Sequence, residues 1–319
     1  MSWDPLLCRT SLNLELEAHP LGFPFKICSN SQLPLDAARR SFGCFSSRFR
    51  SPRIEARLIV ADNGPATLPE PPVFRAQHHL LAIVSDAANF AMCDLQSGFA
   101  FGCIGPAAAA DPGFLSFYFL EAIAYTLLGQ LCVTPIHASC VACGRTGVLL
   151  CGAAGAGKST LAYACARRGW TLISDNASYL LDSGGRTAVA GRPQSVRFGP
   201  GAADFFPELD EHLNGDRING KNVLDLSTAR PPGVSTGFDC EVSLVVFLSR
   251  RAGAGARMSP ISEDEAFQRF LSETARFRDE VELRQRQSIL NLVRTGVFEL
   301  EYEKLEDAID ELERRVTGK

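Results

Sequence analysis

A run of small residues that ends in Lys158 carries the side chains and backbone groups that bind phosphate. It fits the P-loop pattern G-x-x-x-x-G-K-[ST] without a gap and comprises Gly152, Ala153, Ala154, Gly155, Ala156, Gly157, Lys158, Ser159 and Thr160. Small residues let successive backbone N–H groups curl around a polyphosphate, and a following helix adds its positive N-terminal end. The lysine of such a loop reaches the β- and γ-phosphates, and the next hydroxyl binds Mg²⁺. The run therefore predicts a polyphosphate-binding site.

The segments on both sides of this run have the patterns that a P-loop requires. The apolar run 148–151 predicts a buried strand, and residues 160–169 predict a helix with an apolar face. Arg167 and Arg168 suit the negative C-terminal end of that helix, and Gly169 is placed to end it. The order of strand, glycine-rich loop and helix favours a phosphate-binding loop over a chance match.

Two further polar residues are predicted to lie near the loop. The extended runs 136–142 and 148–151 flank a turn at 143–147, so they predict a hairpin that brings His137 near the loop. Residues 170–174 predict a strand that ends at Asp175. A carboxylate at the carboxyl end of a strand beside a P-loop can bind Mg²⁺ or orient a nucleophile. The alternative is an aspartate that only begins a turn or helix.

Composition excludes several classes of function. The formal net charge is −4, with no long run of like charge, so nucleic acid and anionic lipid are not expected partners. Eleven cysteines, an odd number in a chain without a signal peptide, indicate reduced thiols and a cytoplasmic protein. Cys140 and Cys143 form a lone C-x-x-C without further zinc ligands at finger-like spacing, which favours two small strand residues over a metal site.

The chain is expected to contain two domains. Residues 1–110 alternate short apolar runs with Pro/Gly clusters and predict a strand-rich N-terminal domain of unassigned role, with a short helix over 35–41. Residues 111–319 are expected to form the phosphate-binding domain, with 111–133 as a connecting helix. That helix is apolar enough to raise the question of a membrane, but Glu121 in its middle favours a buried helix of a soluble protein.

The remainder of the second domain reads as a mixed α/β fold. Strands are expected over 179–181, 186–190, 242–248 and 297–302, and helices over 263–271, 276–295 and 305–316. The run 242–248 ends in Ser-Arg, whereas ATPases of the ABC and AAA types have a carboxylate at that position, so a motor or transporter ATPase is disfavoured. The predicted fold class is α/β, a mixed sheet with flanking helices.

The stretch from His137 through the P-loop to Asp175 resembles the C-terminal catalytic domain of HPr kinase/phosphorylase and its HPr-kinase-like relatives. In that family a histidine begins the hairpin before the P-loop, at the same interval as His137 from Lys158. An Asp-Asp pair there ends the strand after the helix, where this chain has Asp175 and Asn176. The resemblance covers residues 136–181 well and the rest of the C-terminal half weakly.

The resemblance implies a P-loop fold of the PEP-carboxykinase-like type that uses ATP and Mg²⁺ to phosphorylate a hydroxyl, usually of serine. It implies that Gly152–Thr160 binds the phosphates, that Ser159 and Asp175 bind Mg²⁺, and that His137 supports the reacting site. Asn176 replaces the second aspartate, which is expected to orient or deprotonate the hydroxyl. The family's Glu-bearing, Gly-rich signature and phosphorylase loop have no counterpart here, which disfavours the reverse reaction. The N-terminal half does not resemble that of the bifunctional enzyme, which disfavours HPr as the substrate.

The sequence therefore predicts a cytoplasmic kinase that moves the γ-phosphoryl group of ATP to a serine-type hydroxyl. Lys158, Asp175 and His137 are its expected catalytic residues. The acceptor is a protein, a peptide or a small molecule, and the oligomeric state is open, a homo-oligomer included. One rival is a nucleotide-binding regulatory protein without efficient transfer, which Asn176 motivates. A decarboxylating PEP-carboxykinase-like enzyme is less favoured, because it needs further metal ligands and a carboxylate-binding arginine.

Overall fold

The computed structural model describes residues 9–318 except 184–185, 200–201, 210–216, 219–220, 227–230, 232, 254 and 274–278. The chain divides into two compact units, Met1–Cys132 and Val133–Lys319. The P-loop run, His137 and Asp175 all belong to the second unit.

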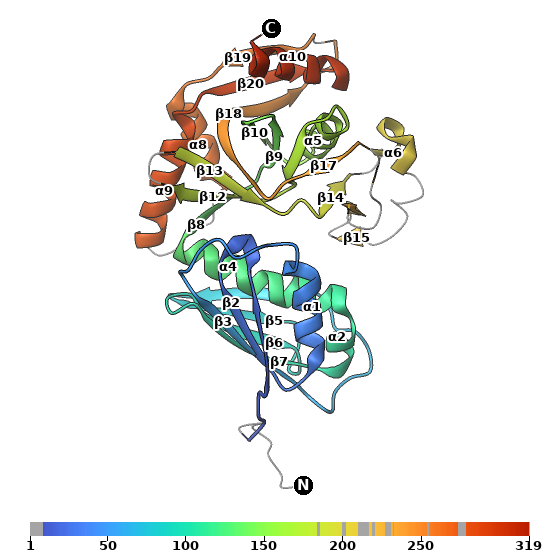
Figure 1. Cartoon of the computed structure of the whole chain (residues 1–319), viewed down its shortest axis with the longest axis vertical. Coiled ribbons are helices and arrows are strands. Elements are labelled where there is room, and N and C mark those ends of the chain that lie inside the picture. The colour runs from blue at the N-terminus through green and yellow to red at the C-terminus, as the bar shows by residue number, and fades with distance from the viewer. Residues whose placement is uncertain are drawn as a thin grey trace. The chain divides into compact units, whose positions relative to one another are not determined.

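The first unit is built on one seven-stranded mixed sheet of order β1-β2-β3-β7-β6-β5-β4 (Figure 1). β2, β3 and β7 are parallel, and β7, β6, β5 and β4 form an antiparallel meander. The strands are β1 (Leu14–Ala18), β2 (Phe25–Ser29), β3 (Ile54–Val60), β4 (Val73–Gln77), β5 (Leu80–Val84), β6 (Phe90–Asp94) and β7 (Phe99–Ile104).

Helices with apolar faces pack on this sheet. α1 (Gln32–Phe42) begins at Ser31, whose hydroxyl accepts a hydrogen bond from the Leu33 amide at 3.4 Å. Its buried residues include Leu35 and Phe42. The other helical segments are η1 (Pro20–Gly22), α2 (Pro106–Ala110), α3 (Pro112–Leu115), the π-helical η2 (Ser116–Glu121) and α4 (Ala122–Leu131).

The helical stretch Pro112–Leu131 is long and apolar enough to cross a membrane by length and composition alone, and 61% of an apolar 18-residue window within it is buried inside the protein. It packs against α1 and β3, and Glu121 in its middle is buried. The whole stretch lies in the first unit. The two units therefore divide after Cys132, whereas the sequence predicted a boundary at residue 110. The difference arises because the helix packs against the first sheet. The helical pattern of a sequence does not specify the sheet against which the helix packs.

The second unit contains a ten-stranded mixed sheet. Along its main path the order is β17-β11-β9-β10-β18-β13-β12-β8, and β20 pairs with both β18 and β19. Its strands are β8 (Val133–Ile136), β9 (Ser139–Cys143), β10 (Thr146–Cys151), β11 (Thr171–Ser174), β12 (Ser178–Ser183), β13 (Arg186–Gly191), β17 (Ser235–Thr236), β18 (Asp239–Arg250), β19 (Arg257–Pro260) and β20 (Val297–Tyr302).

Both faces of this sheet are covered, which explains the continuous apolar run of β10. Val148 and Leu150 pack with the helices α5 (Lys158–Arg167) and α10 (Leu305–Thr317). Leu149 and Cys151, which alternate with them, pack with α8 (Glu263–Glu273) and α9 (Asp279–Val293) on the other face. Figure 1 shows α8 and α9 on one side of the sheet and α5 on the other.

A small sheet of order β14-β16-β15 packs beside α5. Its core is an aromatic cluster in which the ring of Tyr163, on α5, contacts Phe198 and Phe206 edge to face, with centroids 5.4 and 4.8 Å away. The elements of this region are β14 (Ser195–Phe198), α6 (Ala202–Phe205), η3 (Pro207–Leu209), β15 (Arg217–Ile218) and β16 (Lys221–Asp225). The cluster fixes β14, which contributes to the candidate site.

Most elements expected from the sequence are confirmed. The strand before the P-loop, the helix after it and the hairpin formed by β9 and β10 lie where the patterns predicted them. The turn between β12 and β13, at 184–185, lies outside the described residues. β4 was not expected, because its sequence does not alternate apolar with polar residues. In the structure all five of its residues are exposed.

Candidate functional site

The P-loop run forms a tight turn between β10 and α5. Several positions of this turn have a backbone conformation that favours glycine. Gly152, Gly155 and Gly157 have φ angles of +135°, +86° and +94°, a region that side chains with a Cβ rarely adopt. The Ala156 amide donates to the Ala153 carbonyl at 3.1 Å and closes the loop. α5 begins directly after the loop, and the first amides of a helix point out of its N-terminal end, where a phosphate can accept hydrogen bonds from them.

Lys158 is the first residue of α5 and folds back over the loop. Its Nζ donates to the carbonyls of Gly152 at 2.7 Å and Ala153 at 3.2 Å, and its side chain is only 7% exposed. A buried cation held by two backbone carbonyls is a positive charge with a fixed position. The loop therefore combines amide donors with an oriented ammonium group.

Tyr302, at the end of β20, supports the loop from the side. Its Oη lies 3.3 Å from the Ala156 carbonyl, to which it donates. Burial raises the pKa of Tyr302 to about 12, and the nearby Arg250 only partly opposes this. The hydroxyl consequently keeps its proton at neutral pH and remains a donor to the loop.

Gly157→Ala is expected to destabilise the protein and to disturb phosphate binding. A Cβ at this position would lie 2.7 Å from the Tyr302 Oη, in addition to the cost of the positive φ. Gly155→Ala is the matched control, because φ is also positive there but nothing lies within 4 Å of the added Cβ. The φ cost is about 1–2 kcal/mol for each variant.

Urea denaturation measures the difference between these two variants. Gly157→Ala should lose more free energy of unfolding than Gly155→Ala, and Tyr302→Phe in the Gly157→Ala background should recover part of the excess. Equal losses in the two glycine variants would mean that Tyr302 does not restrict the loop.

Asp175 follows β11 directly, and its carboxylate is held by two donors. The Ser139 hydroxyl donates to Oδ1 at 2.9 Å, and the Arg197 amide donates to Oδ2 at 2.8 Å. Ser139 begins β9 and Arg197 lies in β14, so three separate elements fix the position of this side chain. Each carboxylate oxygen has a second lone pair that can accept a proton or a metal ion.

Asn176 occupies a tight turn after Asp175. It has a φ of +66°, and the Ala177 amide donates to the Asp175 carbonyl across it at 2.8 Å. Asparagine and aspartate adopt this left-handed conformation more readily than other residues with a Cβ. The backbone therefore suits the asparagine present here, and it would accept an aspartate equally well.

His137 lies in the turn between β8 and β9, two residues before Ser139, and is partly buried. In the sheet, Ser139 is opposite Leu150 and Cys140 is opposite Ser174. The start of β9 therefore lies between the carboxyl ends of β10 and β11. The turn that contains His137, the P-loop and Asp175 consequently share one edge of the sheet.

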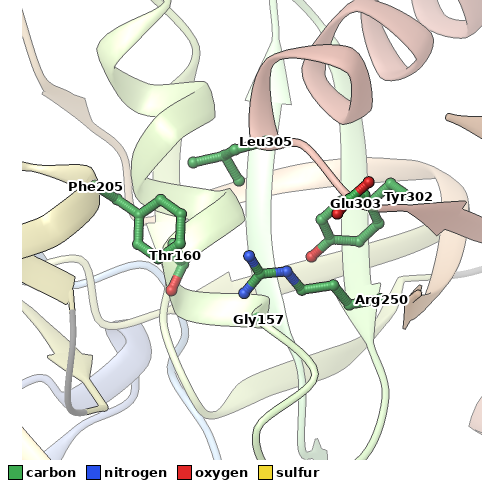
Figure 2. Close-up of a pocket in the computed structure, with 7 residues that line it drawn as sticks. All are labelled: Gly157, Thr160, Phe205, Arg250, Tyr302, Glu303 and Leu305. Carbon is green, nitrogen blue, oxygen red and sulfur yellow. The ribbon is translucent and has the colours of Figure 1, made fainter. Parts of the chain in front are cut away.

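A pocket that the sequence pattern did not predict lies on the other side of the P-loop. Figure 2 shows the Arg250 guanidinium extending toward Gly157. The pocket is lined by Gly157, Thr160, Phe205, Arg250, Tyr302, Glu303 and Leu305. The sequence signal for this pocket is the Ser-Arg pair that follows the run 242–248, because it places Arg250 at the carboxyl end of a strand next to the P-loop strand.

The donors at this edge suit Mg²⁺ rather than a metal held by protein alone. Among the described residues, no group of three or more His, Cys, Asp or Glu side chains could hold a metal ion. Mg²⁺ usually binds through one or two carboxylates together with substrate phosphates and water. Ser159 and Asp175 are the residues whose hydroxyl and carboxylate fit that chemistry.

The ten cysteines within the described residues are free thiols. Cys140 and Cys143 both lie on β9, and the Cys140 Sγ is 3.5 Å from the Sγ of Cys240. Burial raises the pKa of the Cys143 and Cys151 thiols, so both favour the neutral form.

The chain matches no family model and no curated protein. Among solved structures, the HPr(Ser) kinase/phosphatase from Coxiella burnetii is similar to it, with 15% sequence identity and a TM-score of 0.33. The similar region covers 58% of this chain and 93% of that chain. Identity and TM-score are both too low to assign this chain to a family or an activity.

Proposed function

We propose that the protein is an ATP-dependent phosphotransferase of the HPr-kinase-like type, with a PEP-carboxykinase-like second unit. It moves the γ-phosphoryl group of ATP to a serine-type hydroxyl of a protein, peptide or small molecule in the cytoplasm. The observation that carries the proposal is the arrangement of one sheet edge. A P-loop with a buried lysine and a carboxylate fixed by two donors lie there, at the carboxyl ends of β10 and β11, with β9 between these two strands.

The P-loop supplies charge neutralisation. Lys158 and the backbone amides at the start of α5 bind the phosphates, and the fixed position of Nζ means that little reorganisation is needed when charge develops on the γ-phosphoryl group. Ser159 and Asp175 hold Mg²⁺, which neutralises charge on the phosphate oxygens. Phosphoryl transfer depends mainly on positioning and electrostatic stabilisation, and this edge provides both.

Asp175 orients the hydroxyl that attacks the phosphorus atom. Its two hydrogen bonds hold the carboxylate in one orientation, and a free lone pair can accept the hydroxyl proton as the new P–O bond forms and the bond to ADP breaks. His137 supports the reacting site from the turn before β9. These roles require the acceptor to approach from the β9 and β11 side of the loop.

The second candidate is a nucleotide-binding regulatory protein with little or no transfer. Asn176 favours it, because an amide stands in the turn where the family that the sequence resembles has a second carboxylate. An amide cannot accept the proton of the attacking hydroxyl. The two candidates share the nucleotide site and differ only in the chemical step.

The test is transfer of labelled γ-phosphate from Mg²⁺-ATP. Free serine, serine-containing peptides and small alcohols are offered separately as acceptors. The kinase proposal expects a labelled phosphate ester with at least one acceptor class and ADP in equal amount. Binding of ATP without ester formation for any acceptor would support the regulatory protein.

A further inference from the structure

The pocket beside Gly157 lies at the carboxyl ends of β18 and β20. Both strands run parallel to β10, and Arg250 and Tyr302 are their last residues. Glu303 follows β20 and Leu305 begins α10. The carboxyl ends of parallel strands form the crevice in which α/β proteins bind ligands. The pocket therefore opens on the same edge of the sheet as the P-loop.

The strand order places this pocket and Asp175 on opposite sides of the P-loop. Along the sheet the strands follow the order β11-β9-β10-β18-β20. Asp175 lies at the carboxyl end of β11, on one side of the P-loop. Arg250 and Tyr302 lie at the carboxyl ends of β18 and β20, on the other side. A ligand that lies along the P-loop can therefore reach toward Asp175 with one end and toward the pocket with the other.

The orientation of ATP along the P-loop follows from the proposed function, on which this inference rests. Transfer requires the γ-phosphoryl group to face Asp175, so the nucleoside must leave the loop in the opposite direction. Gly157 and Thr160 belong both to the loop and to the pocket lining, and amides at the end of a P-loop contact the α- and β-phosphates. The group attached to the α-phosphate would enter this pocket.

The pocket has the surface that a nucleobase needs. Phe205 is 43% exposed, and its ring centroid lies 5.4 Å from the Arg250 Cζ. Figure 2 shows the Phe205 ring and the Arg250 guanidinium on the side of the pocket toward Thr160. An exposed aromatic ring and a planar guanidinium both stack on the flat face of a base. Leu305 adds an apolar contact on the α10 side.

We infer that Phe205 and Arg250 form the nucleoside subsite, in which the base of ATP stacks on the phenyl ring and the guanidinium. The exposed ring of Phe205 then has a ligand to cover it. Tyr302 plays a different part, since its hydroxyl is already donated to the loop. The subsite gives ATP an affinity that its triphosphate alone does not have.

The test compares the dissociation constants of ATP and inorganic tripolyphosphate, both with Mg²⁺, by calorimetry on the full chain. Phe205→Ala should weaken ATP binding between about fivefold and 150-fold, and tripolyphosphate binding should not change. Arg250→Lys keeps the cation but loses the planar group, so it should also weaken ATP binding selectively. Phe74→Ala is the matched control, because Phe74 is 44% exposed in the first unit.

Three outcomes would overturn the inference. ATP binding could remain unchanged in both variants, or both ligands could weaken equally, which would make the residues part of the phosphate site or of the fold. The variants could also raise the KM of the phosphoryl acceptor with ATP affinity unchanged, which would make the pocket an acceptor site. Selective loss of ATP affinity in a protein that transfers no phosphate would uphold the subsite and reject only the kinase.

Discussion

Lys158→Ala is expected to reduce kcat/KM for ATP by about 10²- to 10³-fold, the range measured when one oriented charge-stabilising donor is removed from an active site. The Nζ of this lysine lies within 3.2 Å of two loop carbonyls and is almost fully buried. Its position is therefore fixed before ATP binds. Steady-state release of ADP with Mg²⁺ measures the effect.

Arg145→Ala is the matched control for this variant. Arg145 is an exposed cation in the hairpin turn at the opposite end of β10, so its removal changes the net charge equally without touching the loop. The control should retain the turnover of the wild-type protein. If Lys158→Ala also retained it, the P-loop would not bind the reacting phosphates and the proposed function would be wrong.

Asp175→Asn is expected to lower turnover by about 10²- to 10⁴-fold, the usual contribution of a positioned base. The amide has nearly the shape of the carboxylate and can still accept a hydrogen bond from Ser139 or from the Arg197 amide. The fold should therefore be retained. ATP affinity should change much less than turnover, provided that most of the binding comes from the loop, and calorimetry separates the two effects.

Asn176→Asp is the companion variant. Its backbone conformation suits aspartate, so the substitution should not unfold the protein. If Asp175 already performs both carboxylate roles, turnover should stay within a few fold of wild type. A large gain of turnover from an inert wild-type protein would instead identify a nucleotide-binding regulator that lacks its base.

The sequence predicted the local part of the site well. Residues 148–160 form a strand, a loop and a helix through contacts between near neighbours, and the motif specifies glycine at Gly152 and Gly157, two of the positions where φ is positive. The pattern of 170–174 likewise predicted the strand that ends at Asp175. These features depend on periodicity and turn chemistry, which a single sequence contains.

The long-range part of the site could not be predicted. Ser139 and Arg197 reach Asp175 from 36 and 22 residues away, and Tyr302 reaches Ala156 across 146 residues. Such contacts depend on strand order, which the sequence does not encode locally. For the same reason the helix at 112–131 was expected in the second domain although it packs in the first unit.

The most direct test of the central claim is Mg²⁺-dependent ADP release, measured for the wild-type protein and Asp175→Asn at ATP concentrations that saturate both. We expect slow but measurable ADP release from the wild-type protein, faster release when a hydroxyl acceptor is added, and a loss of at least about 10²-fold in the variant. Equal rates in the two proteins, or no ADP from a wild-type protein that binds ATP, would contradict the central claim.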